Sequence, residues 1–456
     1  MQINDKIKVE CVDLNHQGLG VCKVDGFPIF VGNIITGEMG VIEITKLYKN
    51  YGYGKLIELK KTSAFRVKPR CPIFGICGGC EIMHLDYQQQ LEHKVKMAEE
   101  TFKRIGHLDL KVDYIIGMED PFYYRNKVQI PYQMKKEKVI CGFYQKGTHA
   151  IVPFDECFIQ PKQATDVAQF VRNLANEFKI PAYDEATKQG NLRHVLIRKT
   201  ANDDYMVVLI TKEEVIPHVE KIVSKIVNRY GNVKTILQNI NKKDTNVILG
   251  PSSKVLYGPG ILIEDLMGLK FKVSHQSFFQ TNHIQTNKLY QQVLDYLKPK
   301  DTEIIIDGYC GVGTISLLLA SKCKYVYGIE IVEEAIKDAK ENAGLNRINN
   351  VEFIVGKTEE EIQKINESID AIVVDPPRKG CDRSLLEAII EKTIKKIVYV
   401  SCDVATLARD LEILAKAYDI KGITLVDMFP HVSDVETCVL LELNNNNNNN
   451  ILFKNK

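Results

Sequence analysis

Cys402 stands where a thiol could act as a nucleophile. It follows the strand-like residues VYVS, and a helical pattern, VATLARDL, begins immediately after Asp403. A helix N-terminus stabilises a thiolate and lowers the pKa of the thiol, which makes a cysteine there reactive. Free cysteine is also one of the most buried residue types, so a core cysteine is the competing interpretation. The other motifs of the sequence are needed to distinguish a nucleophile from a core cysteine.

A glycine-containing loop follows an apolar strand further upstream. The run EIIID leads into Asp307-Gly-Tyr-Cys-Gly311-Val-Gly313-Thr314, and a helical pattern comes next. Such glycines let the backbone approach a ligand at a helix N-terminus, and this suits a dinucleotide or an adenosyl group. Glu330 ends the next strand, where a carboxylate can accept both ribose hydroxyls. Because a third glycine is missing, the pattern favours S-adenosylmethionine.

The motif Asp375-Pro-Pro-Arg378-Lys-Gly ends another strand. Its two prolines stiffen the backbone, so the loop can hold a carboxylate and a carbonyl against a flat substrate. In amino methyltransferases a similar slot usually ends in an aromatic residue, and Arg378 in that place disfavours methylation of an exocyclic amine. The next strand ends at Cys402, at the sheet edge where open α/β sheets bind ligands. This placement favours the nucleophile.

Methylation of a uracil ring at C5 would explain the thiol, because C5 is a poor nucleophile until a thiolate adds to C6. The reaction also needs a base that removes the C5 proton. Glu436 precedes the apolar run TCVLLEL, where partial burial raises a carboxyl pKa. Asp434 and His431 are alternative bases. A carboxylate that only caps an edge strand is the structural interpretation of Glu436.

Three of the twelve cysteines are clustered, with the spacing CxxxxxCxxC, at Cys71, Cys77 and Cys80. Twelve cysteines in a chain without a secretory signal argue against a disulfide framework. Thiolates at this spacing suit an iron–sulfur cluster or a zinc ion, and spacing alone leaves both open.

The elements that position these residues fall into three regions. Residues 1–61 read as short alternating strands and predict a small OB-like barrel. Residues 62–265 mix helical and strand patterns and predict an α+β domain. Residues 266–456 alternate strands with helices and predict a parallel, doubly wound sheet. The run Asn444–Asn450 reads as a flexible segment without chemistry.

Composition and charge limit the class of protein to which the chain can belong. The chain has 456 residues, 45% hydrophobic and 26% charged, and a formal net charge of +2. No apolar run approaches the roughly 20 residues that span a membrane, so we expect a cytoplasmic protein with no membrane contact. Between Lys46 and Arg70 lie eight basic residues and one acid, Glu58, interleaved with Tyr48 and other aromatics. That pattern suits a nucleic-acid surface or a solvated charged face.

Taken together, five motifs resemble the RNA (uracil-5-)-methyltransferases, over nearly the whole chain and in the order of that family. They are SFFQTN ending at Asn282, DGYCGVG, DPPRKG, SCD around Cys402, and HVSDVET ending at Thr437. The resemblance implies a Rossmann-like class I methyltransferase domain. It implies Cys402 as nucleophile and Glu436 as base. It also implies cofactor contacts at Gln280, Tyr309, Glu330 and Asp375.

The barrel and the cysteine cluster resemble the branch of that family that carries a TRAM domain and methylates 23S ribosomal RNA. The resemblance implies a [4Fe–4S] cluster held by Cys71, Cys77, Cys80 and Cys157, with S-adenosylmethionine as cofactor. It implies 23S rRNA as the partner and no obligate protein partner. The alternatives are a non-catalytic RNA-binding or assembly factor, and a methyltransferase acting on C5 of a tRNA uridine or of cytosine.

Overall fold

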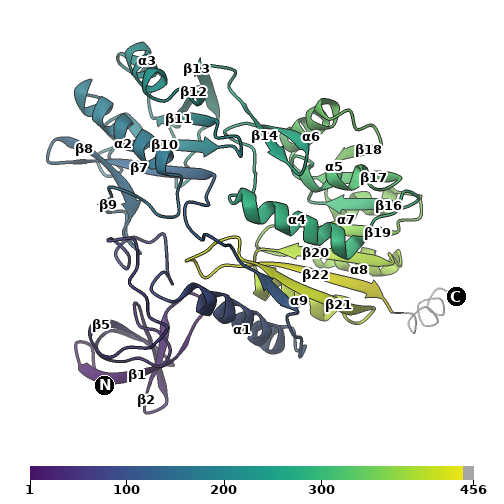
Figure 1. Ribbon diagram of the computed structural model, residues 1–456, viewed down its shortest axis with the longest axis horizontal. Helices are drawn as coiled ribbons and strands as arrows, with labels where there is room; N and C mark the ends of the chain where they lie inside the picture. The colour runs from purple at the N-terminus through teal and green to yellow at the C-terminus, as the bar shows by residue number, and fades with distance from the viewer. Residues whose placement is uncertain (445–456) are drawn as a thin grey trace.

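The chain begins with a closed barrel, which confirms the N-terminal barrel of the expected fold class. The computed structural model describes residues 1–444 of the chain, and the barrel lies at one corner of the molecule (Figure 1). Its strands pair in the order β1-β2-β3-β5-β4: β1 (Lys6–Leu14), β2 (Gly20–Val24), β3 (Phe27–Val31), β4 (Met39–Leu47) and β5 (Gly52–Lys61). Alternate side chains such as Ile42 and Ile44 fill the interior, as the two-residue period of a strand requires.

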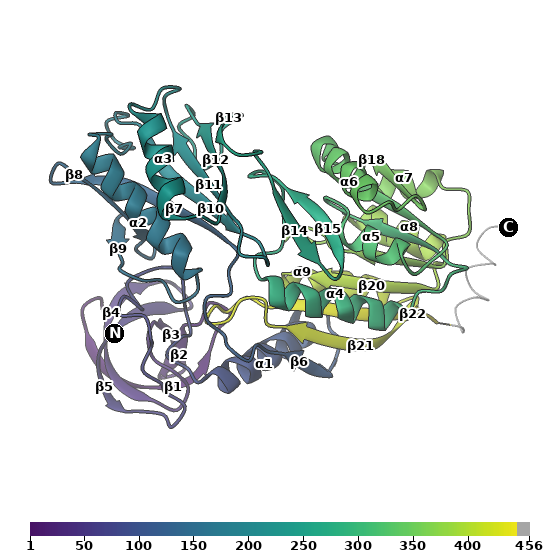
Figure 2. The ribbon, with the colours of Figure 1, turned by 45° about the horizontal axis from the view of Figure 1, so that its top comes forward.

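A mixed sheet of seven strands forms the second lobe, in the order β13-β12-β11-β10-β7-β8-β9. Its strands are β7 (Lys127–Lys135), β8 (Lys138–Tyr144), β9 (Ile151–Pro153), β10 (Leu192–Lys199), β11 (Tyr205–Thr211), β12 (Val233–Ile240) and β13 (Ser252–Tyr257). The helices α2 (Lys162–Glu177) and α3 (Val219–Arg229) pack on this sheet. A short hairpin, β14 (Leu262–Leu266) with β15 (Leu269–Val273), leads out of this lobe (Figure 2).

The third lobe contains an eight-stranded sheet in the order β18-β17-β16-β19-β20-β22-β21-β6. Its strands are β6 (Tyr114–Ile116), β16 (Ile304–Gly308), β17 (Tyr325–Glu330), β18 (Val351–Val355), β19 (Ala371–Val374), β20 (Lys396–Ser401), β21 (Tyr418–Val426) and β22 (Glu436–Leu443). The strands from β18 to β20 are parallel and almost entirely apolar, because helices cover both faces of the sheet. The doubly wound, Rossmann-like architecture expected from the sequence is confirmed.

Helices connect these strands: α4 (His283–Leu297), α5 (Thr314–Ala320), α6 (Glu333–Leu345), α7 (Thr358–Lys364), α8 (Arg383–Glu391) and α9 (Val404–Leu414). None of the helices in residues 1–444 combines the length and the apolar character that crossing a bilayer requires. The asparagine run lies outside the described residues, except for its first member, Asn444.

A segment that precedes the central sheet joins the third lobe. The strand β6 pairs in parallel with β21, with Ile115 opposite Leu425. The helix α1 (Tyr87–Ile105) packs on α9, and Figure 2 shows it beneath β21 and β22. The side chain of Asp86 caps α1 by accepting hydrogen bonds from two backbone N–H groups of its first turn. Residues 87–116 are therefore in physical contact with the sheet that carries the predicted site.

Candidate active site

The strand register gathers three predicted residues at one edge of the large sheet. Residues 304–308 of β16 pair in register with β17 on one side and with β19 on the other. The next residue of each strand in that register is Tyr309, Glu330 or Asp375. Since parallel strands end at a common edge, the three side chains lie side by side at the mouth of the sheet.

Register also brings Cys402 and Glu436 together, although 33 residues separate them in the sequence. The antiparallel strands β20 and β22 pair up to Ser401 and Thr437. The next position outward on each strand is Cys402 on one and Glu436 on the other. A thiol and a carboxyl therefore meet where the parallel strands also end.

All six of the predicted cofactor and catalytic residues line one cavity of about 1690 Å³. A pocket for one drug-sized ligand measures roughly 300–1,000 Å³, so this cavity has room for a cofactor and a nucleobase together. The predicted residues that line it are Gln280, Tyr309, Glu330, Asp375, Cys402 and Glu436.

Several buried polar atoms in this cavity have no hydrogen-bond partner among the described residues. They are the Oδ1 atom of Asp307, the Oγ1 atom of Thr281 and the Oε2 atom of Glu436. Leaving such atoms unsatisfied costs free energy, and native proteins pair almost all of them. Their grouping in one cavity fits a polar ligand that supplies the missing partners.

The glycine loop fixes the carboxylate of Glu330. The backbone N–H of Gly311 donates to its Oε2 atom at 3.2 Å, and that of Val332 donates to its Oε1 atom at 2.9 Å. Gly313 has a φ of 82°, and a Cβ there would lie 2.8 Å from the ring of Phe353. Only glycine meets both conditions, so the close turn requires it.

Burial raises the pKa of the carboxyl groups in the cavity. The pKa of Glu436 rises to about 8, mainly through burial and then through the neighbouring charge of Asp375. Burial raises the pKa of Asp375 as well, and that of Asp307 to about 7. Carboxyls with such values can exchange protons near neutral pH.

The thiol of Cys402 differs from the expectation of a lowered pKa. Its pKa is raised to about 12, mainly by burial and then by the carboxylates of Glu436 and Asp375, and Arg378 opposes them. The side chain of Asp403 caps α9 by accepting a hydrogen bond from the N–H of Thr406. Desolvation and two neighbouring carboxylates thus outweigh the helix N-terminus.

The two other candidate bases have different surroundings. The carboxylate of Asp434 pairs with the guanidinium of Arg378 at 2.8 Å. The ring of His431 stacks on Phe122 with centroids 4.7 Å apart, and burial lowers its pKa to about 4. Neither Asp434 nor His431 lines the large cavity, whereas Glu436 does.

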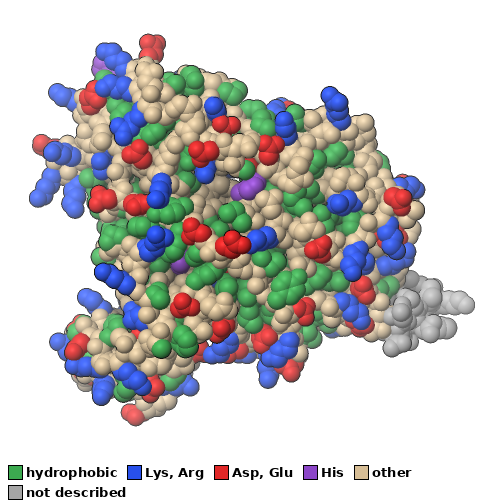
Figure 3. All heavy atoms as spheres, viewed as in Figure 1, with side chains coloured by type: hydrophobic (Ala, Val, Ile, Leu, Met, Phe, Trp, Pro, Cys, Tyr) green, Lys and Arg blue, Asp and Glu red, His purple; other side chains and the backbone are tan. Residues whose placement is uncertain are grey.

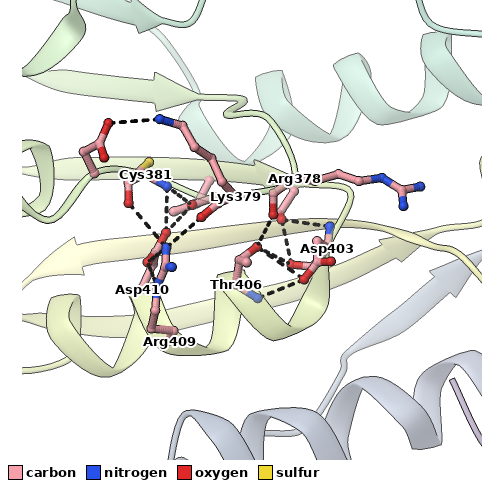
Figure 4. A network of polar contacts seen from close by, with 10 residues as sticks. Arg378, Lys379, Cys381, Asp403, Thr406, Arg409 and Asp410 are labelled. Atoms are coloured by element: carbon pink, nitrogen blue, oxygen red, sulfur yellow. Dashed lines mark hydrogen bonds and ion pairs between the residues drawn. The ribbon is translucent and has the colours of Figure 1, made fainter. Parts of the chain in front are cut away.

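The loop that follows Asp375 is tied to the helix that follows Cys402. The hydroxyl of Thr406 donates to the carbonyl of Arg378 at 3.1 Å, and the guanidinium of Arg409 donates to the carbonyl of Lys379 at 3.0 Å. Figure 4 shows these contacts from α9 to the loop above it, with the guanidinium of Arg378 extending away from the helix. The buried carboxylate of Asp410 accepts from the N–H of Cys381 at 2.9 Å. The network therefore fixes both sides of the cavity relative to one another.

The four clustered cysteines line a second cavity, of about 360 Å³. They are Cys71, Cys77, Cys80 and Cys157, and all four are free thiols. Burial raises the pKa of each thiol, and the charges of the others raise it further for three of them. Among residues 1–444, no group of three or more His, Cys, Asp or Glu side chains is placed to hold a single metal ion.

Sequence reasoning missed two residues that line the large cavity. Asp307 was noted only as the start of the glycine loop, yet its carboxyl is buried there and accepts a hydrogen bond from Ser316 at 2.5 Å. Its position at the end of a buried apolar strand was the available signal. Phe429 also lines the cavity, and nothing in the local sequence distinguishes it from a core phenylalanine.

Known proteins resemble this chain over almost its whole length. An uncharacterized RNA methyltransferase of Oceanobacillus iheyensis is 45% identical, over 94% of this chain and 95% of its own. One of Clostridium acetobutylicum is also 45% identical, over 96% of this chain and 97% of its own.

A solved structure shares the fold. It is the tRNA (uracil-54, C5)-methyltransferase of Pyrococcus abyssi in complex with S-adenosyl-L-homocysteine, with a TM-score of 0.78 and 27% identity. The match covers 95% of this chain and 100% of that one. The family described as tRNA (Uracil-5-)-methyltransferase matches residues 86–444, which include every motif of the large cavity. The chain therefore belongs to this family of S-adenosylmethionine-dependent RNA methyltransferases that act on C5 of uracil.

Proposed function

We propose that this protein methylates C5 of a uridine in 23S ribosomal RNA through a covalent adduct between Cys402 and C6 of the uracil. The observation that carries the proposal is the shared cavity. It places a thiol and a buried carboxyl at adjacent strand ends, beside the acidic residues of a cofactor site. The target uridine has to leave its stack to enter this cavity.

In the proposed reaction, the Sγ atom of Cys402 bonds to C6 and the ring electrons move toward O4, which makes C5 nucleophilic. The thiol proton has to leave first, and the nearby carboxylate of Asp375 can accept it, which leaves Glu436 ionised for the later step. C5 would then take the methyl group as the bond between the methyl carbon and the cofactor's sulfur breaks, and the demethylated cofactor would leave as a neutral thioether. Glu436 removes the C5 proton, the C5–C6 double bond re-forms, and the Cys402 thiolate leaves.

The cofactor site fits S-adenosylmethionine, which supplies an electrophilic methyl group. We assign the ribose hydroxyls to the carboxylate of Glu330, which two backbone N–H groups already orient. Tyr309 and the polar side chains of Gln280 and Asp375 are the remaining contacts we assign to the cofactor. Their role is to bind it and to exclude water.

The barrel carries a surface suited to RNA. The rings of Tyr48 and Tyr51 stack with centroids 4.9 Å apart, and Tyr53 and Phe30 lie against them at 5.8 Å from Tyr51. Tyr48 is 50% exposed, and exposed lysines flank it at Lys46 and Lys49. Figure 3 shows lysine and arginine side chains over the barrel and over the central lobe. Exposed rings stack on unpaired bases, and the lysines meet phosphates.

We propose a [4Fe–4S] cluster in the cysteine cavity, because the four thiols that line it match the four thiolate ligands that such a cluster requires. Such a cluster would link Cys157 to the segment that carries Cys71, Cys77 and Cys80. Metal analysis of protein purified without air is the test. Iron and sulfide in equal amounts support the cluster, and zinc without iron contradicts it.

The decisive experiment is adduct trapping with 23S rRNA fragments that carry 5-fluorouridine, in the presence of S-adenosylmethionine. Fluorine cannot leave as a proton does, so the covalent complex should persist. Mass spectrometry of the digested complex should find a methylated fluorouridine on the peptide that contains Cys402. An adduct on another peptide, or none on RNA that binds and is methylated in its natural form, would overturn the mechanism.

A tRNA substrate is the second candidate, because the structurally similar Pyrococcus abyssi protein is a tRNA (uracil-54, C5)-methyltransferase. Both RNAs should be offered in the same assay. Mapping of 5-methyluridine in the two products separates the candidates, and 5-methylcytidine in either would contradict uracil as the target.

A further inference from the structure

The loop that delivers Glu436 is held by residues from other parts of the chain. We call residues 427–435, which join β21 to β22, the base loop. Five successive carbonyl oxygens of this loop, from Asp427 to His431, accept hydrogen bonds from outside it, the first two from the side-chain amides of Gln285 and Asn282. The carbonyl of Phe429 accepts from Lys94, that of Pro430 from the hydroxyl of Tyr124, and that of His431 from the N–H groups of Glu81 and Ile82, all at 3.0–3.1 Å.

Gln90 contacts the base loop at His431 through both ends of its side-chain amide. It lies on the first turn of α1 and is 1% exposed. Its Nε2 atom donates to the carbonyl of Leu85 at 2.8 Å and lies 3.2 Å from Nδ1 of His431. Its Oε1 atom accepts from the backbone N–H of His431 at 3.0 Å. One amide thus joins the segment that follows the clustered cysteines to the base loop.

The orientation of this amide is determined by its partners. A carbonyl oxygen can only accept and a backbone N–H can only donate, so the nitrogen of Gln90 has to face Leu85 and its oxygen has to face the N–H of His431. The remaining amide hydrogen then points to Nδ1 of His431, which acts as an acceptor. The ring of His431 is therefore neutral and carries its proton on Nε2.

The contact falls at the point where the base loop is conformationally most restricted. His431 has a φ of 67°, in the left-handed region that residues other than glycine rarely adopt. Such a conformation costs about 1–3 kcal/mol and persists only when surrounding contacts impose it. Both polar backbone atoms of His431 are bonded to other segments, and its ring is stacked on Phe122.

We propose that Gln90 is a positioning residue for the base, and that it keeps the carboxyl of Glu436 in place by holding the backbone turn at His431. This inference rests on the role of Glu436 in the proposed function. Gln90 does not line the large cavity, so it has no contact with substrate there. Its removal should therefore impair the step that uses Glu436 more than the addition of Cys402 to the uracil.

The test compares Gln90→Leu with the wild type on natural, unfluorinated RNA. If C5 proton removal slows, the methylated covalent intermediate outlives its formation and accumulates on a denaturing gel. We expect kcat to fall on the order of 10- to 100-fold, as for small misplacements of reacting groups. The KM for RNA should stay within about twofold of the wild type, because no binding contact is lost.

Gln88→Leu is the matched control, since Gln88 is exposed on the same turn of α1 and its side chain makes no hydrogen bond among the described residues. If Gln90→Leu does not fold, Tyr124→Phe replaces it. This variant removes only the hydroxyl that donates to the carbonyl of Pro430, and it should show the same accumulation to a smaller extent.

The outcomes separate the inference from the proposed function. A purely structural role for Gln90 would lower the melting temperature and reduce the covalent complex and the product together, and that result overturns the inference. Unchanged kcat overturns it as well. If the wild type forms no adduct with 5-fluorouridine RNA that it binds, the proposed function fails instead.

Discussion

The ammonium of Lys94 and the carboxylate of Asp427 form an ion pair at 2.6 Å, and neither side chain is exposed to solvent. Lys94 belongs to α1, whereas Asp427 begins the base loop 333 residues later. The same ammonium donates to the carbonyl of Phe429, and the hydroxyl of Tyr87 donates to the second oxygen of Asp427 at 2.7 Å. The pair therefore joins α1 to the base loop inside the protein.

Replacement of Lys94 by Met should destabilise the protein strongly. The buried carboxylate of Asp427 would lose its counter-charge, and breaking such a pair from one side costs about 3–5 kcal/mol. Thermal unfolding of Lys94→Met and of Lys96→Met makes the comparison, because Lys96 is exposed on the same helix. Lys96→Met should change the free energy of unfolding by no more than about 0.5 kcal/mol. Equal melting temperatures for the two variants would show that the buried pair contributes nothing.

Glu436→Gln should raise the stability of the protein, and more so at alkaline pH. The folded-state pKa of about 8 lies above that of an unfolded glutamate, about 4.3. The folded protein therefore favours the protonated carboxyl. The contribution of protonated Glu436 to the free energy of unfolding is fully present below pH ~4, and it is lost as the pH rises toward and through 8. Because Gln cannot ionise, the variant should melt at a higher temperature than the wild type at pH 8.5, with a smaller difference at pH 5.

The control for this measurement is Glu442→Gln, on the same strand, a carboxyl that does not line the large cavity. Its melting temperature should follow that of the wild type across the pH range. If the Glu436 and Glu442 variants shift alike, burial of Glu436 is not the cause.

The rate of methylation should rise with pH in the neutral to mildly alkaline range. The base works only when ionised, and the folded-state pKa of Glu436 is about 8. The thiol of Cys402, whose pKa is raised to about 12, also ionises more as the pH rises. We therefore expect log kcat to increase between about pH 6.5 and 8.5. Single-turnover rates measured on one RNA across this range provide the check, and a pH-independent rate would contradict both assignments.

The local motifs could be predicted because strand ends are encoded locally. The residues that end β16, β17, β19 and β20 follow short apolar runs, and parallel strands have to end at one edge. Tyr309, Glu330 and Asp375 could therefore be placed together without knowledge of any long-range contact.

Contacts between segments far apart in the chain could not be predicted from the local sequence. The three residues of β6 carry no signal that they pair with β21, about 300 residues later. The thiol pKa of Cys402 depends on carboxylates from β19 and β22, which cannot be located from the sequence around it. Gln90 looks like any polar residue of an amphipathic helix, although it is buried against the base loop.

Cys402→Ala should abolish methylation and leave RNA binding unchanged. The other thiol that lines the cavity, Cys310, belongs to the glycine loop of the cofactor site, and removal of a covalent nucleophile typically leaves only a trace of activity. Cys323→Ala is the control, since that thiol is buried in the turn between α5 and β17 and does not line the cavity. Transfer of radiolabelled methyl groups measures activity, and filter binding measures affinity. Residual turnover within about tenfold of the wild type would exclude Cys402 as the nucleophile.

The aromatic and basic residues of the barrel should contribute to RNA binding in separable ways. Tyr48→Ala removes a ring that can stack on a base, worth about 1–3 kcal/mol, so the affinity for an unstructured RNA oligonucleotide should fall about 5- to 150-fold. The dependence of affinity on salt should stay the same, because no charge is lost. Lys46→Ala with Lys49→Ala removes two cations and should reduce the slope of log K against log salt by about 1.4.

Tyr257→Ala is the matched control, because Tyr257 is 40% exposed on β13 of the central sheet and has no aromatic partner among the described residues. Fluorescence anisotropy of the labelled oligonucleotide at several salt concentrations gives both quantities. If Tyr48→Ala binds as the Tyr257 variant does, the rings of the barrel are not a stacking surface. If the lysine variant keeps the salt slope of the wild type, the phosphates are bound elsewhere. Stacking and counterion release are independent contributions to the same complex. If the barrel binds RNA, Tyr48→Ala should therefore lower the affinity at an unchanged slope of log K against log salt, whereas the double lysine variant should reduce that slope.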